Sequence, residues 1–496
     1  MLESIKNYLL NTQKIEITQD AKDKIKRSRA VVEKVISDGK VVYGINTGFG
    51  KLSYINIPND KLEQLQINLL RSHACGIGEP IDTDIVKLMM ILKVRNLSEG
   101  NSGVSLSVVE KITELYNKEI YPVVPRRGSV GASGDLAPLA HMALPLIGEG
   151  EVFYKGKKRD AADLVTEGIY QPAQPGAKDG LSLINGTQYS TALLLSIFLE
   201  AEKLVYMAEL ALALSIEADM ATDRPFDARI HNVRCQTGQK QVAENVCKLL
   251  QYSKLIESHK DCKKVQDPYC YRCAPQVLGS VRDTLTYVKN ILENEIDAVT
   301  DNPLVFPEDG EIISAGNFHA EPIAMAADYL TIAITELGNI SERRIASLID
   351  TTMSGLPPFL IEYSGLNSGF MIAHVTAAAL AAENRTLANP ASVETISTSA
   401  NQEDHVSMAP NAGLKALQVL NNAKNIIWIE MLAAAQGIDF RGKLKGGKGT
   451  QLGYDKIRSL VPHLDDDRIF YKDLEKCDKF FRDEDFYKQI LTILNN

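Results

Sequence analysis

The sequence predicts a mainly α-helical protein, an elongated antiparallel bundle with a mixed N-terminal domain. After residue 190, apolar residues recur at helical spacing. Several of these segments run for about twenty residues or more, and short loops with proline or glycine separate them. The first 190 residues instead carry frequent glycine, proline and short apolar runs. We therefore expect two domains, residues 1–190 and residues 191–496.

Composition and charge exclude several classes of function. The chain has 496 residues, 45% of them hydrophobic, which is typical of a globular protein. A net charge of -9 argues against binding of nucleic acid. The most apolar stretch, residues 191–199, ends at Glu200, so we expect no membrane span. Seven cysteines without a secretory signal predict free thiols and a cytoplasmic protein.

Each long helix has a pattern of its own. Residues 191–220 are apolar on nearly every face, which predicts a helix at the centre of the bundle. Residues 281–299 form an amphipathic helix that stops before Asn302-Pro303. Three more helices are expected over residues 321–350, 369–387 and 414–436, the last of them closed by Gly437. Because long apolar faces need partners, we expect the chain to form oligomers.

Two glycine-rich segments resemble nucleotide loops only superficially. Residues 40–43 predict a short strand or extended piece that leads into the turn of residues 44–50. The glycine spacing there does not match a dinucleotide fingerprint, so a structural turn is the better interpretation. In residues 442–448, Gly449 follows where a phosphate-binding loop needs Ser or Thr, which indicates a basic surface loop.

The segment Ala132-Ser133-Gly134 is able to become an electrophile. Gly134 has no side chain, so its amide nitrogen can fold back onto the Ala132 carbonyl carbon. Loss of two waters then turns Ser133 into a methylidene and gives a methylidene-imidazolone ring. Asp135 and the apolar run behind it predict a helix that starts beside this ring. The triplet alone is also compatible with an ordinary small-residue loop.

A rival signal is a set of possible zinc ligands with the pattern HxxC…CxxC. It consists of His259, Cys262, Cys270 and Cys273. The residues between them, Gln266 to Tyr269, and Arg272 have a better explanation below, so we predict no metal site.

The isolated His73 and Glu403 are compatible with structural roles when each is considered alone.

Taken together, these motifs resemble the aromatic amino-acid ammonia-lyases over about residues 38–436. The matching segments are Tyr43–Gly50, Ser72-His73, Gly128–Leu139, Asn185–Thr187, Gln266–Tyr269, Arg272-Cys273, Gly316–His319 and Gln402–His405. The resemblance implies a methylidene-imidazolone that forms autocatalytically from Ala132, Ser133 and Gly134, without an external cofactor. It also implies that Asn185 lies beside this group and orients it.

The remaining roles follow from the resemblance as well. Arg272 binds the substrate carboxylate, for which its planar fork is suited. Gln266 and Phe318 shape the pocket. Tyr43, from a neighbouring subunit, and Tyr269 move protons or position the amine. The base that takes the β-proton is one of Tyr43, Tyr269 and Glu403, and the sequence leaves these alternatives open.

His73 and Glu403 determine the expected substrate. In the phenylalanine-type members these sites are apolar and amide-like, whereas a histidine and an acid suit the two nitrogens of an imidazole. The resemblance therefore implies elimination of ammonia from L-histidine to trans-urocanate, the first step of histidine degradation. It also implies a homotetramer with active sites shared between subunits. The alternative is a tyrosine or phenylalanine ammonia-lyase, or an aminomutase, of the same family.

A few residues depart from the family pattern. Ala320 stands where glycine is expected, Cys75 where alanine is frequent, and Cys270 and Tyr271 where serine and leucine are usual. None of them is a catalytic residue of a motif. Cys270 adjoins Tyr269, so the shape of the pocket and its sensitivity to thiol reagents stay open.

Overall fold

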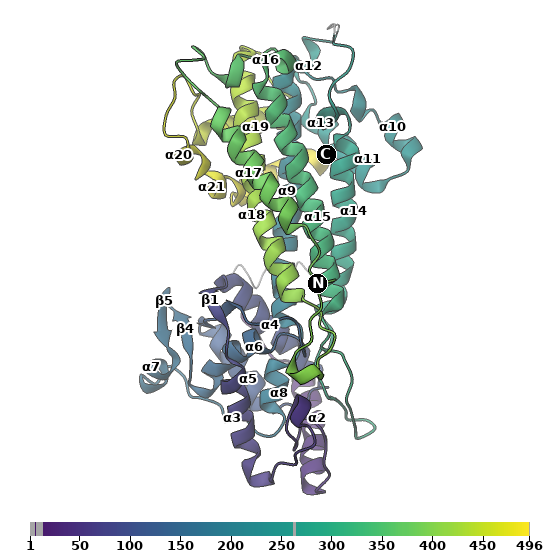
Figure 1. Ribbon diagram of the computed structural model, residues 1–496, viewed down its shortest axis with the longest axis vertical. Helices are drawn as coiled ribbons and strands as arrows, with labels where there is room; N and C mark the ends of the chain where they lie inside the picture. Colours follow the sequence, from purple (N-terminus) through teal and green to yellow (C-terminus); the bar gives the residue numbers. More distant parts are fainter. Residues whose placement is uncertain (1–4, 6–12, 261–263, 496) are drawn as a thin grey trace. The chain divides into compact units, whose positions relative to one another are not determined.

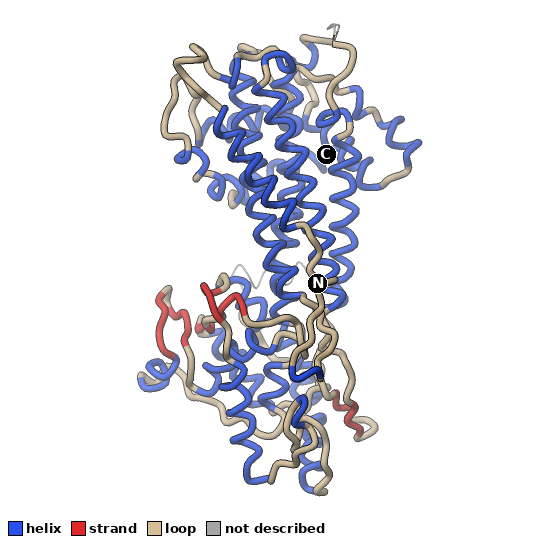
Figure 2. Tube along the Cα trace, in the orientation of Figure 1, coloured by secondary structure: helices blue, strands red, loops and turns tan. Residues whose placement is uncertain are grey.

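The chain divides into two compact units, each assembled from separate stretches of sequence. The computed structural model describes residue 5, residues 13–260 and residues 264–495. Unit 1 comprises Met1–Ser196, Lys289–Asp328 and Pro390–Leu414, and unit 2 comprises Ile197–Val288, Tyr329–Asn389 and Lys415–Asn496. The predicted boundary at residue 190 lies near Ser196, where the chain first leaves unit 1. A single boundary does not account for residues 289–328 and 390–414, which return to unit 1. The mainly α-helical class is confirmed (Figures 1 and 2).

Short helices and three small antiparallel sheets make up unit 1. Its helices include α2 (Gln19–Ser37), α3 (Leu62–His73), α4 (Thr83–Ser98), α5 (Leu106–Asn117), α6 (Leu136–Ala143), α7 (Ala161–Thr166) and α8 (Asp179–Ile184). The sheets pair β1 (Ile77–Pro80) with β3 (Pro125–Arg127), β2 (Ile120–Pro122) with β4 (Glu151–Tyr154) and β5 (Lys157–Asp160), and β6 (Leu304–Phe306) with β7 (Glu311–Ile313). This mixture agrees with the glycine-rich and proline-rich N-terminal sequence.

Helix α4 is a central element of unit 1. Its N-terminus is capped by Asp82, whose carboxylate accepts a hydrogen bond from the Asp84 amide at 2.8 Å. Nearly every residue from Ile85 to Leu97 is buried, including Lys93, which has no exposed surface. A helix that is buried on all faces has little amphipathic pattern, which is why the sequence did not single it out.

Long helices dominate unit 2 (Figure 1). The five longest that contribute to it are α9 (Gln188–Asp219), α14 (Ala274–Glu295), α15 (Glu321–Ile349), α17 (Met371–Leu387) and α18 (Ala409–Phe440). Shorter helices accompany them: α10 (Ala228–Arg234), α11 (Thr237–Leu249), α12 (Lys254–Glu257), α13 (Tyr269–Arg272), α16 (Thr351–Ser354), α19 (Lys448–Leu460), α20 (Tyr471–Leu474), α21 (Cys477–Phe481) and α22 (Glu484–Asn495). The five long helices are those that the sequence predicted.

A buried polar cluster joins three of these helices inside unit 2. The Glu430 carboxylate on α18 accepts hydrogen bonds from Ser215 on α9 at 2.8 Å and from Ser341 on α15 at 2.5 Å. It also pairs with Arg344, whose Nη2 atom lies 2.8 Å away, and neither charged side chain is exposed. Because every carboxylate oxygen has a partner, the cluster fixes the relative register of the helices.

Replacing Glu430 with alanine is expected to destabilise the protein by about 3–5 kcal/mol, because Arg344 is left charged and buried without a partner. The midpoint of urea unfolding measures the effect. Replacing Lys424, which pairs with Glu200 at a partly exposed site, serves as the control and should cost less than about 1 kcal/mol. Equal midpoint shifts in the two variants would contradict this view of the cluster.

Two predicted details differ from the structure. Gly437 does not close α18, which continues to Phe440. A side chain at position 437 would lie 3.0 Å from the Ala218 Cβ atom, so the glycine permits close helix packing instead. Residues 40–43 form no strand; they lead into the turn through a hydrogen bond from the Val42 amide to Asn46. The predicted apolar stripe of α14 is buried, as expected.

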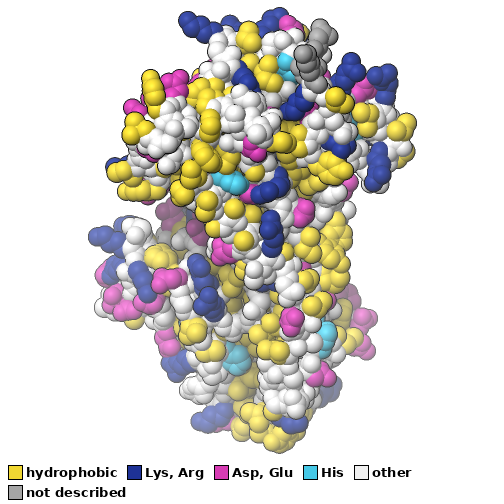
Figure 3. Space-filling model, turned by 45° about the horizontal axis from the view of Figure 1, so that its top comes forward, with side chains coloured by type: hydrophobic (Ala, Val, Ile, Leu, Met, Phe, Trp, Pro, Cys, Tyr) yellow, Lys and Arg dark blue, Asp and Glu magenta, His cyan; other side chains and the backbone are white. Residues whose placement is uncertain are grey.

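Some large hydrophobic side chains of unit 2 remain exposed. They include Tyr329 and Ile332 on α15, and Met371, Ile372 and Val375 on α17. Hydrophobic atoms are prominent on the face of the molecule drawn in Figure 3. None of the described helices combines the length and the hydrophobicity that a bilayer span requires.

Candidate active site

The segment around Ser133 is a tight loop with unusual backbone angles. Ser133 has a φ of 51° and Gly134 a φ of 78°, so two successive residues adopt the left-handed conformation. The Ser129 hydroxyl accepts a hydrogen bond from the Gly131 amide at 3.1 Å and donates one to the Gly134 carbonyl at 3.4 Å. A left-handed serine is uncommon and is retained where the surroundings enforce it.

Gly186 supplies the surface against which this loop lies. Gly134 and Gly186 form an isolated parallel bridge, and the Asp135 amide donates to the Gly186 carbonyl at 2.8 Å. A side chain at position 134 would collide with that carbonyl oxygen. Glycine at 134 is therefore required both by the backbone angle and by the close approach of Gly186.

Asp135 lies between two helices and is fully buried. It precedes α6, as predicted, but its carboxylate makes no capping bond to that helix. Instead it accepts hydrogen bonds from the Ser190 amide and the Ser190 hydroxyl in the first turn of α9, both at 2.8 Å. Burial raises the pKa of the Asp135 carboxyl to about 6. Asp135 thereby anchors the loop to the start of α9.

Glu403 contacts the loop directly, although 270 positions separate it from Ser133 in sequence. The Ser133 hydroxyl donates to Glu403 Oε1 at 3.1 Å, and the Thr398 hydroxyl donates to Oε2 at 2.8 Å. Thr398 and Glu403 also form an antiparallel bridge across the turn of residues 399–401, all of which have positive φ. This strained turn orients the carboxylate toward Ser133.

His73 and Tyr43 share the environment of Glu403. His73 ends α3, and its Nδ1 atom lies 2.8 Å from the Leu69 carbonyl oxygen, which leaves Nε2 for a ligand. Burial lowers the pKa of His73, and the Glu403 charge opposes this shift. Burial raises the pKa of Tyr43, whose hydroxyl accepts a bond from the Gly50 amide at 3.5 Å. The chain's own Tyr43 thus lies in unit 1 with Glu403.

Asn185 and Phe318 also belong to unit 1. Asn185 caps the C-terminus of α8, and its Oδ1 atom is buried without a hydrogen-bond partner among the described residues. Phe318 is half-buried and precedes His319. The His319 ring stacks on that of His405, and its Nε2 atom lies 3.2 Å from the His405 carbonyl oxygen. These contacts join the segment after Phe318 to the segment after Glu403.

Three side chains that could ligate a metal lie close together in unit 1. Among the described residues, His319, Glu321 and His405 are the one group with ligand atoms close together, within 4.8 Å. The hydrogen bond and ring stack account for the proximity of the two histidines. In the predicted zinc alternative, His259 has both ring nitrogens near carbonyl oxygens, those of Leu255 and Ala221. Cys262 lies outside the described residues.

The three other predicted residues, Gln266, Tyr269 and Arg272, belong to unit 2. Arg272 lies over the Tyr269 ring, 4.3 Å from its centroid. Its Nε atom is buried without a hydrogen-bond partner, and Arg272 forms no ion pair with any residue in the described ranges. The guanidinium is therefore available for an anionic ligand. Gln266 and Tyr269 are exposed.

A cavity of about 560 Å³ in unit 2 is lined by Tyr269 and by Cys270. Burial raises the pKa of the Cys270 thiol to about 11, so this cysteine stays protonated and poorly reactive at neutral pH. Cys75, by contrast, is exposed. The two cysteines that depart from the family pattern, Cys75 and Cys270, therefore differ in how accessible they are to thiol reagents.

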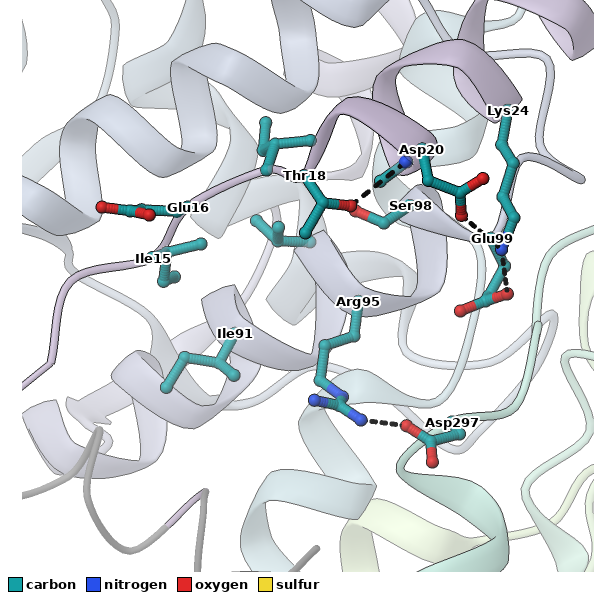
Figure 4. A pocket seen from close by; sticks show the side chains of 13 residues that line it. Ile15, Glu16, Thr18, Asp20, Lys24, Ile91, Arg95, Ser98, Glu99 and Asp297 are labelled. Atoms are coloured by element: carbon teal, nitrogen blue, oxygen red, sulfur yellow. Dashed lines mark hydrogen bonds and ion pairs between the residues drawn. The ribbon is translucent and has the colours of Figure 1, made fainter.

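Another cavity, of about 270 Å³, lies in unit 1 and contains none of the predicted site residues (Figure 4). Arg95 pairs with Asp297 on its wall, and Lys24 lies 3.2 Å from Asp20 and 3.7 Å from Glu99. These five charged groups pair among themselves, and the sixth charged residue of the wall, Glu16, is exposed.

Two residues that shape the site were not found from the sequence. Ser190 holds Asp135, and Thr398 holds Glu403. Thr398 lies in a run of small residues that predicts only a loop. The contact between Thr398 and Glu403 is recognisable only in three dimensions. Ser190 carries a signal in the sequence, because it lies in the first turn of α9, where the backbone amides of a helix need hydrogen-bond acceptors.

Comparison with known proteins shows the family of this chain. The family model for aromatic amino acid lyases matches residues 1–459. The histidine ammonia-lyase of Vibrio cholerae is 50% identical over 464 residues, which cover 93% of this chain and 91% of that protein. The histidine ammonia-lyase of Legionella pneumophila is 47% identical over 494 residues, 100% of this chain and 97% of that protein.

Solved structures share the fold as well. The histidine ammonia-lyase of Trypanosoma cruzi matches with a TM-score of 0.91 and 41% identity, covering 99% of this chain and 94% of that chain. The tyrosine aminomutase of Streptomyces globisporus matches with a TM-score of 0.93 and 34% identity, covering 99% and 97%. Lyases and aminomutases therefore share this architecture. By sequence and by fold, the chain belongs to the aromatic amino acid lyase family.

Proposed function

We propose that this chain is a carbon–nitrogen lyase that eliminates ammonia from L-histidine and releases trans-urocanate, the first step of histidine degradation. The observation that carries the proposal is the contact between Glu403 and Ser133. It joins an acid suited to an imidazole ring to the residue from which the electrophile is made. The relatives named histidine ammonia-lyase support the same substrate.

The loop fits the formation of a methylidene-imidazolone from Ala132, Ser133 and Gly134. Left-handed angles at Ser133 and Gly134 fold the backbone sharply, and Gly186 leaves no room for a side chain at position 134. The ring supplies an electrophilic carbon for the substrate amine, which makes that amine a better leaving group. The unpartnered Asn185 Oδ1 atom marks Asn185 as the neighbouring polar side chain that orients the ring.

Maturation also changes the surroundings of Glu403. The Ser133 oxygen leaves as water, so Glu403 Oε1 loses the partner that it has in the unmodified chain. Thr398 continues to hold Oε2. A carboxylate fixed on one side and vacant on the other is suited to accept the N–H of an imidazole. His73 Nε2 offers a partner to the second ring nitrogen.

The remaining residues act on the amino acid portion of the substrate. Arg272 binds its carboxylate through the planar guanidinium, and Gln266 and Phe318 shape the pocket. Tyr43 keeps its proton at neutral pH because burial raises its pKa, which favours positioning of the amine or donation of a proton. Tyr43, Tyr269 and Glu403 remain the three alternatives for the base that takes the β-proton.

We further propose a cytoplasmic homotetramer in which neighbouring subunits complete each active site. Hydrophobic side chains exposed on α15 and α17 are suited to pack against other copies. Arg272 and Tyr269, which lie in unit 2, would then serve the Ser133 loop of another subunit. Tyr43 and Glu403 both lie in unit 1 of one chain, so Tyr43 can lie beside Glu403 without coming from a neighbouring subunit.

Replacing Glu403 with glutamine is expected to lower kcat/KM for L-histidine by about 10- to 100-fold, because a charge-assisted hydrogen bond to the imidazole is lost. Activity is measured as urocanate and ammonia released, with L-tyrosine and L-phenylalanine as competing substrates. The double change of His73 to leucine and Glu403 to glutamine should shift the preference further toward the carbocyclic substrates.

The matched control is Glu394→Gln, an exposed glutamate in the same segment. It should leave kcat/KM unchanged. The mass of each variant is recorded to show that the loop has matured. If matured Glu403→Gln retains the wild-type preference for L-histidine, the proposed role of Glu403 is wrong. A β-amino acid formed without ammonia would instead favour the aminomutase alternative.

A further inference from the structure

Lys93 is a lysine without exposed surface in the core of unit 1. It lies on α4, among side chains that are otherwise nearly all buried. Lysine is rarely buried to this extent, because transfer of an ammonium group from water is costly unless it is paired. No motif of the sequence singled it out, and none of the roles described so far uses it.

The ammonium group of Lys93 is directed at the end of α8. Its Nζ atom donates hydrogen bonds to the Asn185 carbonyl at 2.7 Å and to the Ser182 carbonyl at 3.2 Å. These carbonyls belong to the last turn of α8 and to its cap, where backbone oxygens have no partner within the helix. A cation at this position also interacts favourably with the negative end of the helix dipole.

The nearest carboxylates are not direct partners of Lys93. The Asp301 carboxylate pairs at 2.8 Å with Lys178, a second fully buried lysine. The Asp135 carboxylate is bonded to Ser190. Burial lowers the pKa of Lys93 to about 7, although the charges of Asp301 and Asp135 favour its protonated form and that of Lys178 opposes it. The cost of burying Lys93 is therefore not offset by a direct ion pair.

The carbonyl that Lys93 holds is next to the surface that supports the Ser133 loop. Asn185 is followed directly by Gly186, which forms the bridge with Gly134 and accepts the bond from the Asp135 amide. The Asn185 side chain has its unpartnered oxygen at the same point. Lys93 Nζ thus binds the carbonyl directly before the backbone segment against which Gly134 lies.

We propose that Lys93 is a positioning residue for the maturation of Ala132, Ser133 and Gly134. By holding the Asn185 carbonyl, it keeps Gly186 against Gly134 and so keeps the loop folded for ring closure. The inference rests on the proposed function, because it concerns the same methylidene-imidazolone. Lys93 acts through the backbone of Asn185 and Gly186 and touches neither the ring nor the substrate.

The chemistry that this geometry serves is balanced. The Gly134 nitrogen bonds to the Ala132 carbonyl carbon, and the oxygen of that carbonyl leaves as water with the amide hydrogens of Gly134 and Ser133. The Ser133 hydroxyl leaves as a second water with the Ser133 Cα hydrogen. No oxidant or further reactant is needed. Lys93 contributes to the arrangement of the loop and gains or loses no proton overall.

The test compares the maturation of four chains: wild type, Lys93→Met, Lys93→Arg and Lys87→Met. Methionine keeps most of the length of the side chain without a donor, and arginine keeps both charge and donors. Lys87 is the matched control, because it is a buried lysine of the same helix that pairs with Asp84 at 2.8 Å. The readouts are the fraction of chains that have lost two waters, by mass, and the near-ultraviolet absorbance of the ring. Circular dichroism establishes that each chain is folded.

We expect folded Lys93→Met to mature at least about tenfold more slowly than wild type, a change that equals 1.4 kcal/mol or more. Lys93→Arg should recover most of the wild-type rate, and Lys87→Met should mature at the wild-type rate. If Lys93→Met does not fold, Lys93→Leu, which is shorter and has no donor, replaces it with the same expectation. Maturation of the folded neutral variant at the wild-type rate would overturn the inference alone. Absence of the two-water loss in wild type would overturn the proposed function, and this inference with it.

Discussion

Replacing Ser133 with alanine is expected to give a folded protein that releases ammonia from L-histidine about 1,000-fold more slowly, or worse. Alanine has no hydroxyl to lose, so the methylidene carbon cannot form and covalent activation of the amine disappears. In the unmodified chain Ser133 donates one side-chain hydrogen bond, to Glu403, and relative to that chain its loss should cost only about 0.5–1.5 kcal/mol of stability. The measurements are ammonia release, ring absorbance and the mass of the purified chain.

The control for this change is Ser107→Ala, which alters an exposed serine on α5. It should mature and turn over substrate as wild type does. A Ser133→Ala protein with wild-type activity would exclude the electrophile made from residues 132–134. A protein that is inactive because it is unfolded is recognised by its circular dichroism, and Ser133→Gly, which also has no hydroxyl and tolerates the positive φ at this position, then tests the same point.

Replacing Arg272 with alanine is expected to lower kcat/KM by about 30-fold or more, because the substrate carboxylate loses a charge-assisted, two-point contact. The Arg272 Nε atom is buried without a hydrogen-bond partner among the described residues, so the free protein already contains the desolvated donor. The loss should appear in both KM and kcat, since the carboxylate also orients the β-carbon. Steady-state kinetics with L-histidine measures it.

Arg272→Lys is the informative companion of that variant. Lysine keeps the charge without the planar fork. The kcat/KM of Arg272→Lys should therefore fall between that of Arg272→Ala and that of the wild type. Loop maturation should be normal in both variants, because Arg272 belongs to unit 2 and the loop to unit 1. Unchanged KM and kcat in Arg272→Ala would show that the carboxylate is bound elsewhere.

The long helices were predictable because their patterns are local. The stripe of apolar residues along α14 recurs at three and four positions, and the same residues are buried in the structure. Gly437 was misread as a helix end because glycine has two uses. It closes helices through a left-handed conformation, and it also permits close packing, as it does against Ala218. Only the neighbouring helix distinguishes these two uses.

The candidate site could be predicted from the sequence where the proposed chemistry involves adjacent residues. The proposed ring closure needs only Ala132, Ser133 and Gly134 in their order along the chain. The residues that hold this loop do not: Glu403 reaches it from 270 positions away, and Lys93 acts on it through Asn185. Such contacts depend on how the elements pack, and a buried lysine on a helix without amphipathic pattern gives no signal in a single sequence.

The division into two units explains a further difference between sequence and structure. A pattern that changes near residue 190 predicts one boundary, because only the onset of the long helices is visible in the sequence. The segments 289–328 and 390–414 return to unit 1, and they carry Phe318 and Glu403. Such a return is a property of the topology, which local patterns do not record.

The most direct test of this account is the product formed by the wild-type protein. Purified protein is incubated separately with L-histidine, L-tyrosine and L-phenylalanine, and the ammonia and the conjugated acid are measured together. The account predicts urocanate and an equal amount of ammonia from L-histidine, with little product from the other two amino acids. A cinnamate-type acid from L-tyrosine or L-phenylalanine, with no urocanate from L-histidine, would contradict it.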